Sequence, residues 1–251
     1  MIRLFRKIRK ELLSEDKYPI YLLYAAGEIS LVVIGILFAL QIDNWNDNRH
    51  TRQTEQLLLK SLKEEMITNL ENLNLAMSYH AKSRRAAKQM VEIYNGSATY
   101  ETTREVDSLL SLLQWAWTFN PSTGVINSIK TSGQLNAIQN TELRAMISTY
   151  EDITDDATEE SKLIQDLIIH RYVPGVSNYI SHNQRADYLG EAYAVGPSAF
   201  VPDYNGLFED RAIESLISYI YVWRIDELQE EEELKRMMER FITLLDEELE
   251  I

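Results

Sequence analysis

Few residues of this 251-residue chain have side-chain types and spacings that could carry out chemistry. The four histidines are His50, His80, His170 and His182. No two of them stand three or four residues apart, so the sequence encodes no helical pair of metal ligands. His80 falls in an apolar helical pattern near Arg84, where a polar side chain more often sets helix register than binds metal. The absence of cysteine excludes a disulfide framework, a thiolate metal site and a cysteine nucleophile.

Motifs for catalysis and nucleotide binding are also missing. The sequence has no GxxxxGK or GxGxxG phosphate loop and no GxSxG nucleophile elbow. The acids between Asp152 and Glu160 lack the spacing and central glycine of an EF-hand, so they indicate a solvated helix face. His170 and His182 flank an irregular segment that contains Asp187, and these three could meet in space. The sequence otherwise predicts no enzyme, no catalytic residue, no metal site and no cofactor.

Glu28 is the one charge in an apolar run over residues 20–42, which at about 23 residues is long enough to cross a membrane. An acid buried in a membrane is costly and is therefore a functional candidate. At about 100° per residue, Gly35 and Ala39 share the azimuth of Glu28, and two small residues allow another helix to approach closely. We predict that this stripe forms a homo-oligomer through the membrane helix. In the alternatives, Glu28 snorkels to the lipid headgroups or couples proton movement.

The flanks of the run indicate one uncleaved transmembrane helix. Aromatic residues at both ends are typical of interfacial belts. They are Tyr18, Tyr21, Tyr24 and Trp45. A signal-peptidase site at Ala39 is poor because Leu37 occupies its −3 position. The remaining alternative, a buried helix of a soluble protein, conflicts with residues 29–40, which are apolar on every face except at Ser30.

The distribution of basic residues predicts the orientation of this helix. The first 20 residues carry six Lys or Arg, whereas the 20 residues after Ile42 carry three. By the positive-inside rule, the N-terminus is cytoplasmic and residues 43–251 lie outside the cytoplasm. Residues 1–19 form either an amphipathic helix held by anionic lipid or a disordered basic tail that only sets topology.

Helical periodicity, with few glycines and prolines, predicts an all-α fold for residues 43–251. A long helix over 48–95 continues from the membrane helix and ends before Gly96. A second long helix over 208–250 packs against it, and together they form an antiparallel bundle. Between them the sequence predicts helices over 103–118, over 122–132 with Ser122 as the cap, and over 141–172, followed by an irregular excursion over 174–206.

Two stretches resemble a family of uncharacterised single-pass membrane proteins common in Bacteroidota. One is YAAGEISLVVIGILFALQIDNWND, at residues 24–47, and the other is FNPSTGVINSIKTSGQLNAIQNTELRAMISTYED, at residues 119–152. The resemblance implies a bacterial inner-membrane protein of unknown function and supplies no catalytic residues. Four polar residues of the second stretch could contact a ligand or partner, although such residues more often satisfy backbone groups at helix ends. They are Asn127, Ser128, Ser132 and Asn136.

The net charge of −14 argues against nucleic acid as a partner, because phosphate binding needs a basic surface. The expected partners are the lipid bilayer and an unidentified protein. The sequence therefore predicts a non-enzymatic scaffold or interaction subunit that presents a periplasmic helical bundle. Two alternatives stay open: a sensory or ligand-binding helical module that signals through a partner, and an energy-coupling subunit that uses Glu28.

Overall fold

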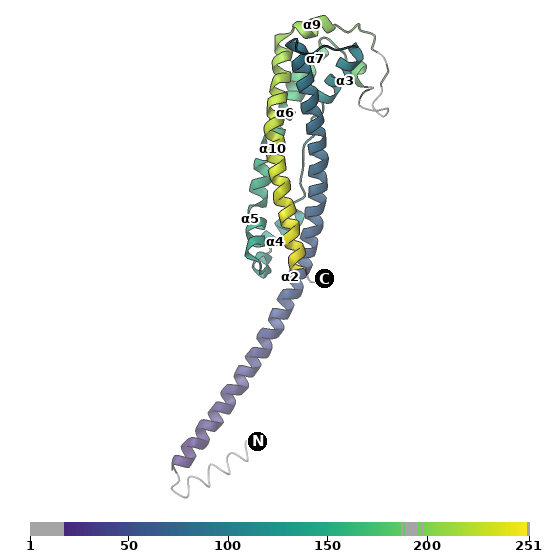
Figure 1. Ribbon diagram of the computed structural model, residues 1–251. Coiled ribbons are helices and arrows are strands. Elements are labelled where there is room, and N and C mark those ends of the chain that lie inside the picture. The colour runs from purple at the N-terminus through teal and green to yellow at the C-terminus, as the bar shows by residue number, and fades with distance from the viewer. Residues whose placement is uncertain (1–17, 187, 189–194, 197, 250–251) are drawn as a thin grey trace. The chain divides into compact units, whose positions relative to one another are not determined.

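The computed structural model describes residues 18–186, 188, 195, 196 and 198–249, with the backbone alone at residues 18–21 and 24. The described residues form helices and no strand, which confirms the all-α prediction. Most of the predicted tail, the side chains of the tyrosine belt, and Asp187 lie outside the described residues. In chain order the elements are α2 (Tyr18–Tyr94), α3 (Thr103–Leu113), α4 (Gly124–Thr131), the 3₁₀ turn η1 (Gln134–Ala137), α5 (Thr141–Asp156), α6 (Glu159–Leu167), the π turn η2 (Ile168–Tyr172), α7 (Val173–Ser177), α8 (His182–Ala186), α9 (Tyr204–Glu209) and α10 (Arg211–Glu248) (Figure 1).

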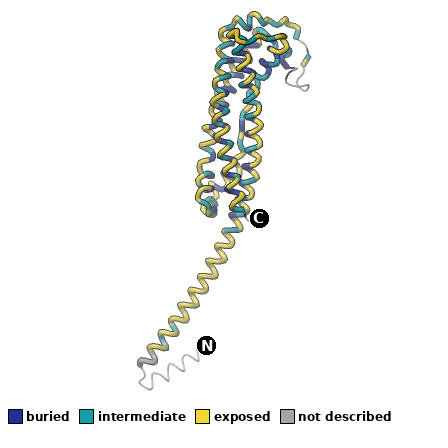
Figure 2. The backbone as a smooth tube through the Cα atoms, viewed as in Figure 1, coloured by how far each residue is buried: buried dark blue, intermediate teal, exposed yellow. Residues whose placement is uncertain are grey.

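The chain divides into two compact units, residues 1–55 and 56–251. The described part of the first unit is the beginning of α2, whose large apolar side chains are exposed from Leu22 to Ile42 (Figure 2). A helix of a soluble protein normally covers its apolar face against a core. By length and composition, α2 is the one helix among the described residues that is long and apolar enough to cross a membrane.

In the second unit, apart from Glu65, Ala86 and Leu244, the buried residues of α2 and α10 follow one another at alternating steps of three and four residues. On α2 they are Leu59, Leu62, Met66, Asn69, Leu73, Ala76, His80, Ser83, Ala87 and Met90. On α10 they are Ile213, Ile217, Ile220, Arg224, Glu227, Glu231, Leu234, Met238, Phe241 and Leu245. This spacing keeps one stripe of each helix turned toward its neighbours. Both stripes are apolar toward their ends and polar in the middle.

Side-chain contacts between α2 and α10 show their register. Gln56 Nε2 donates to the Glu248 carbonyl at 2.9 Å, and Lys63 forms an ion pair with Asp246. Farther along, His80 contacts the carboxylate of Glu231. Residue numbers therefore fall along α10 as they rise along α2, and the two helices lie side by side in this unit (Figure 1).

Two apolar clusters form the core, one on either side of the polar middle of these stripes. The first joins Leu62 and Met66 of α2 to Ile147 of α5 and Phe241 of α10. The second joins residues of α2, α3, η2 and α10, namely Met90, Leu110, Tyr172 and Ile217. Burial of apolar surface on this scale is the main driving force for folding, so the polar layer between the clusters has to be held by its own hydrogen bonds.

The helix predicted over 122–132 begins later and has a different cap. The N-cap residue of α4 is Thr123, whose side chain makes no capping hydrogen bond. Instead, the Glu65 carboxylate of α2 accepts the amide hydrogens of Val125 and Ile126, at 3.0 and 3.2 Å. Ser122 donates its hydroxyl to the same carboxylate at 3.0 Å. A side chain remote in sequence thus replaces the local cap, which is why the cap assigned to Ser122 was wrong.

The single helix predicted over 141–172 is divided. α5 ends at Asp156, and α6 begins at Glu159 after a turn at Thr158, whose hydroxyl donates to the Thr154 carbonyl at 2.9 Å. Such back-bonding offers the backbone an alternative to the helical ladder. After α6 the chain passes through the π turn η2 into α7 and so continues beyond residue 172. Pro174 lies in the first turn of α7 and, because proline has no N–H, removes one donor from the backbone ladder that continues from η2.

The predicted excursion over 174–206 contains more helix than expected, because α7, α8 and the start of α9 lie within it. Asp107 of α3 holds this region in place. Its carboxylate accepts hydrogen bonds from Gln184 of α8 at 3.1 Å and from Tyr204 of α9 at 3.0 Å. Burial raises the pKa of the Asp107 carboxyl, and the two hydrogen bonds oppose that rise. The carbonyl of the fully buried Arg185 accepts the Ser111 hydroxyl at 2.8 Å.

The boundaries of the two long helices follow local signals. α2 ends at Tyr94 and Gly96 has a φ of 75°, so the predicted glycine stop is confirmed. α10 begins at Arg211, three residues after the predicted start. Asp210 is its N-cap, and its carboxylate accepts the amide hydrogens of Ala212 and Ile213 at 2.7 and 3.4 Å.

Candidate functional site

Among the described residues, buried polar groups are most concentrated in the middle of the buried stripes of α2 and α10, where polar side chains replace apolar ones. We call this group the polar layer, and it consists of His80 on α2, Ser161 on α6, and Arg224, Glu227 and Glu231 on α10. Each of these residues is 2% exposed or less. Charged side chains are almost never fully buried unless they are paired, so this layer has to satisfy itself.

His80 fixes the proton arrangement of the layer. Its Nε2 lies 2.8 Å from the Trp117 carbonyl, which can only accept, so Nε2 carries a hydrogen. Its Nδ1 lies 2.9 and 3.1 Å from the two carboxylate oxygens of Glu231. One proton must therefore lie between Nδ1 and this carboxylate, on one or the other. Burial raises the pKa of Glu231, and the hydrogen bond from His80 opposes that rise.

Glu227 accepts hydrogen bonds from two sides. Its Oε2 accepts from Arg224, and its Oε1 accepts the Ser161 hydroxyl and lies 3.4 Å from His80 Nδ1. With Arg224 and one shared proton positive, and the two carboxylates negative, the layer has no net charge. Removing one partner of such a buried ionic set leaves an uncompensated charge and costs far more than an exposed pair would.

The polar layer also explains why α3 ends at Leu113 instead of residue 118. The carbonyls of residues 115–117 all accept hydrogen bonds from side chains of other helices. Arg224 donates to the Trp115 carbonyl at 3.4 Å, Gln165 to that of Ala116 at 3.3 Å, and His80 to that of Trp117 at 2.8 Å. An extended segment presents its carbonyls outward in this way, whereas a helix would use them internally.

A further pair of acids borders the layer in sequence. Glu160 precedes Ser161, and Glu230 precedes Glu231. Each has a buried carboxylate oxygen without a hydrogen-bond donor. Burial, followed by the neighbouring Glu160 carboxylate, raises the pKa of Glu230 to about 7. A proton shared by these two carboxyl groups still leaves one negative charge next to a layer that is itself neutral.

The chemistry open to the polar layer is limited by its burial. It can hold a proton, and its imidazole and carboxylate groups are of the type that binds metal ions. Ser161 is paired with a carboxylate, but that carboxylate is neutralised by Arg224, so it is a poor base for activating the hydroxyl. With these side chains closed from solvent, a substrate has no route to them in this conformation.

The residues predicted to pack in the membrane lie on the first unit's part of α2. Gly35 and Ala39 are exposed, and a Cβ added at Gly35 would have no atom within 4 Å. Glu28 is partly buried. No atom of the described residues covers the face of Gly35, which is therefore open to contact there.

The four polar residues of the second resembling stretch do not converge on one point. Asn127, Ser128 and Ser132 lie exposed on α4 and at its end, and Asn136 lies exposed on η1. The Ser132 hydroxyl donates to the Ser128 carbonyl at 2.6 Å, and Asn127 Nδ2 donates to the Thr123 hydroxyl at 3.0 Å. Their observed contacts are therefore local ones near helix ends.

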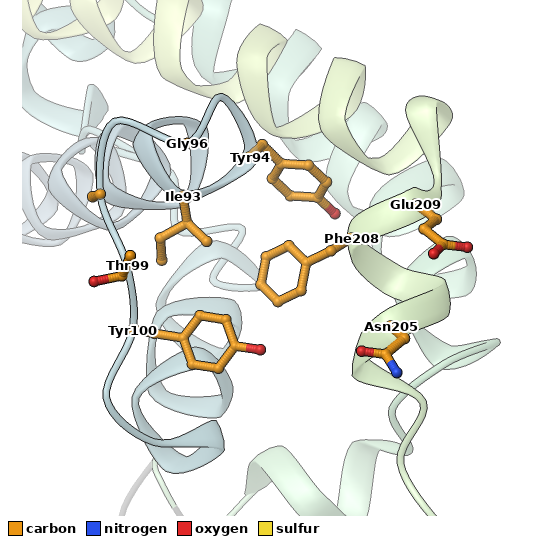
Figure 3. Close-up of a pocket in the computed structure, with 9 residues that line it drawn as sticks. Ile93, Tyr94, Gly96, Thr99, Tyr100, Asn205, Phe208 and Glu209 are labelled. Atoms are coloured by element: carbon orange, nitrogen blue, oxygen red, sulfur yellow. The ribbon is translucent and has the colours of Figure 1, made fainter.

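A hollow of about 530 Å³ lies where the end of α2 and the following segment face α9 (Figure 3). Aromatic rings make up much of it, because Phe208 lies 5.1 Å from Tyr94 and 5.4 Å from Tyr100 between ring centroids. The Tyr94 hydroxyl is already used, since it donates to the Leu207 carbonyl at 2.8 Å. The Glu209 carboxylate points away from the rings. Without convergent polar groups, the hollow lacks the features of a specific ligand site.

The polar layer could have been predicted from polar residues that interrupt the apolar stripes of the two long helices. The spacing rules for metal motifs do not consider residues so far apart in the sequence. His80 was recognised as a polar interruption, but its partners stand about 150 positions away. If the three- and four-residue steps are carried back from Phe241 along α10, they reach Glu231, Glu227 and Arg224. Charged residues at seam positions of both long helices indicate a buried ionic layer wherever the two seams meet.

Comparison with known proteins identifies a family for this chain but indicates no activity. A family model described as a family of unknown function (DUF6090) matches residues 28–156, slightly more than half of the chain. The match includes His80 but not the other members of the polar layer, which lie on α6 and α10. No curated protein matches the chain. No solved structure matches it.

Proposed function

This chain belongs to the DUF6090 family, and we propose that it is a membrane-anchored, non-enzymatic scaffold or interaction subunit of a bacterial inner membrane. In this proposal residues 20–42 span the bilayer, the N-terminus is cytoplasmic, and an antiparallel helical bundle within residues 43–251 is periplasmic. The lipid bilayer and a protein, either a second copy or an unidentified partner, are its binding partners.

The change of surface along α2 carries this proposal. One helix runs from Tyr18 to Tyr94 without a break. Its apolar side chains are exposed from Leu22 to Ile42, whereas those from Leu59 to Met90 are buried along one stripe. Exposed apolar side chains on all faces of a helix are favourable in a lipid bilayer, because lipid contacts the helix on every side. The second pattern is typical of a helical bundle in water.

The absence of an accessible chemical centre among the described residues supports a structural role. The polar layer is closed from solvent, and the hollow beside α9 lacks convergent polar groups. A ligand-binding sensory module is the second candidate, and the aromatic surface of Tyr94, Tyr100 and Phe208 is the observation that favours it. Aromatic rings can bind apolar or cationic ligands, but here they already pack on one another.

The orientation is tested by fusing reporters after Ile251 in the full chain. Alkaline phosphatase, which becomes active only in the periplasm, should be active, and a fluorescent reporter that matures only in the cytoplasm should be dark. Reversed signals from the two fusions would overturn the orientation. Soluble, fully active fusions that do not sediment with membranes would overturn the anchor.

The interaction role is tested by the mass of the native complex, extracted from membranes in a mild detergent. A scaffold or interaction subunit should migrate as an assembly larger than one chain with its micelle. The composition of that assembly then separates a homo-oligomer from a complex with another protein. A single chain per micelle over a range of mild detergents and protein concentrations would contradict the proposal.

A further inference from the structure

Glu231 has too few hydrogen-bond donors for a buried carboxylate. It is 1% exposed, and among the described residues its two oxygens share one donor, His80 Nδ1. Glu227 Oε1 lies 3.4 Å from the same nitrogen. Three carboxylate oxygens thus face a nitrogen that can offer one hydrogen. A buried anion in this position gains from any cation that can contact several oxygens at once.

The separations among these atoms fit the coordination shell of a metal ion. For bonds of about 2.1 Å, neighbouring ligand atoms lie about 3.0 Å apart in an octahedron and about 3.4 Å apart in a tetrahedron. His80 Nδ1 lies 2.9 Å from Glu231 Oε1 and 3.4 Å from Glu227 Oε1. One ligand atom from each of the three residues lies within 4.8 Å of those of the other two.

The surroundings of the three residues resemble the outer shell of a metal site. The Nε2 hydrogen of His80 is held by the Trp117 carbonyl at 2.8 Å, which fixes the ring and leaves Nδ1 toward the carboxylates. Metal-binding histidines characteristically donate their second N–H to a carbonyl or carboxylate in this way. Arg224 and Ser161 hold the Glu227 carboxylate in place, as outer-shell groups hold a ligating carboxylate.

The charge balance permits a divalent cation here. With neutral His80, two carboxylates and Arg224, a divalent ion brings the layer to a single positive charge. The neighbouring carboxyl groups of Glu160 and Glu230 lie on residues adjacent in sequence to Ser161 and Glu231 and supply negative charge near the layer. The metal would replace the proton that His80 and Glu231 otherwise share.

We propose that His80, Glu227 and Glu231 bind one divalent first-row transition-metal ion, such as Zn²⁺, in the centre of the bundle. Nitrogen and carboxylate ligands suit this class of ion better than Mg²⁺ or Ca²⁺, which prefer oxygen alone. The ion would join α2 to α10, so its role is to lock the two long helices together. Because binding takes place in the folded bundle, the ion stabilises the fold.

The test uses the full chain in detergent micelles, stripped of metal with a chelator and titrated with ZnCl₂ in a calorimeter. The wild type should take up one Zn²⁺ per chain, and its thermal unfolding midpoint should rise with added Zn²⁺. Glu231→Gln keeps the shape of the side chain and an acceptor for His80 but removes a charged ligand. This variant should bind Zn²⁺ at least about 100-fold more weakly and lose the thermal shift.

The matched control is His170→Gln. His170 forms an exposed pair with Asp166, at 3.0 Å, and represents surface binding of Zn²⁺. Its affinity and thermal shift should equal those of the wild type. A wild type that takes up no Zn²⁺ above the background of the detergent would overturn the proposal. So would a Glu231→Gln variant that binds as tightly as the wild type, or a His170→Gln variant that alone loses binding.

A spectroscopic measurement keeps the proposal testable if Glu231→Gln fails to fold. In a chain carrying His50→Gln, His170→Gln and His182→Gln, His80 is the one histidine left. One equivalent of Cu²⁺ should then give an electron paramagnetic resonance spectrum with nitrogen coupling from a single imidazole. A spectrum with oxygen ligands alone would show that His80 does not bind the ion, and the proposed site would be wrong.

Discussion

Glu65, in the middle of α2, accepts the amide hydrogen of Val125 at 3.0 Å and so caps a helix that begins about 60 residues later. The carboxylate does the work of an N-cap and lies at the positive end of the α4 dipole. Helix α4 therefore depends on α2 for its first turn.

Replacing Glu65 by Gln should destabilise the bundle by about 1 kcal/mol, because one acceptor oxygen and the negative charge at the start of α4 are lost. The change is measured by chemical denaturation of the full chain in micelles. Glu64→Gln is the matched control, since Glu64 is exposed on the same helix. Equal denaturation midpoints for both variants would show that the contact with α4 contributes nothing.

Asn69→Asp should cost more, about 2 to 3 kcal/mol, because it removes a buried donor and introduces a buried charge. Asn69 Nδ2 donates to the Ser122 carbonyl at 2.7 Å and to the Tyr150 hydroxyl at 2.9 Å. A carboxylate cannot donate to the carbonyl and can only accept from the Tyr150 hydroxyl. Asn74→Asp on the exposed side of α2 is the control, and it should change the unfolding free energy little. An Asn69→Asp variant as stable as this control would contradict the prediction.

The N-cap of α10 should give the protein an acid-sensitive contribution to stability. The hydrogen bond from Tyr179, then that from the Ala212 amide, lowers the pKa of Asp210 below its ordinary value of 3.8. A carboxyl whose folded pKa is lowered stabilises the fold above its unfolded pKa and loses that effect as pH falls through the folded value. Wild type should therefore lose stability below about pH 4 by this route.

Asp210→Asn separates this contribution from other titrations. Asparagine is nearly as good an N-cap, so the variant should remain folded at pH 7. The difference in unfolding free energy between wild type and variant should shrink as pH is lowered from 5 to 3. A difference that is constant over this range would mean that Asp210 titrates alike in the folded and unfolded chain.

Gly35→Leu should abolish self-association if the stripe of Glu28, Gly35 and Ala39 is a packing face, because leucine prevents close approach of a second helix. Insertion should persist, since leucine is more apolar than glycine. Crosslinking in native membranes measures the outcome. Gly27→Leu is the control, because Gly27 lies about 100° around the helix axis from the stripe of Glu28, Gly35 and Ala39. Equal crosslinking of both variants would assign the stripe to plain lipid contact.

The parts of the fold that repeat regularly could be predicted from the sequence. The three- and four-residue steps identified both long helices, and Gly96 marked the end of α2 correctly. Local signals failed where a remote side chain decides the structure. Glu65 determines where α4 begins, and the extended segment after Leu113 is held by side chains from three other helices. Neither relationship has a trace in the local sequence.

Only one member of the polar layer could be recognised from the sequence. His80 was recognised as a polar residue in a seam, but its pairing with Glu231 depends on how the two long helices are aligned. That alignment is set by the apolar clusters on either side, and a shift of one turn would place another residue opposite His80. The spacing of residues along one helix cannot predict which residue lies opposite His80, because that depends on how α2 and α10 pack against each other.

The π turn η2 has a consequence for the length of the chain. The buried residues Ile164, Ile168 and Tyr172 follow one another at four-residue steps, and each such step carries an α-helix about 40° past a full turn. The wider π turn cancels this drift and keeps all three on the core side. His170 and Arg171 point into solvent, so their identities are free to change. Their number can change as well: deleting either would leave Ile168 and the tyrosine three residues apart, and steps of four and then three residues keep one stripe of a plain α-helix on the core side, so the π turn accommodates one residue more than an α-helix would need here.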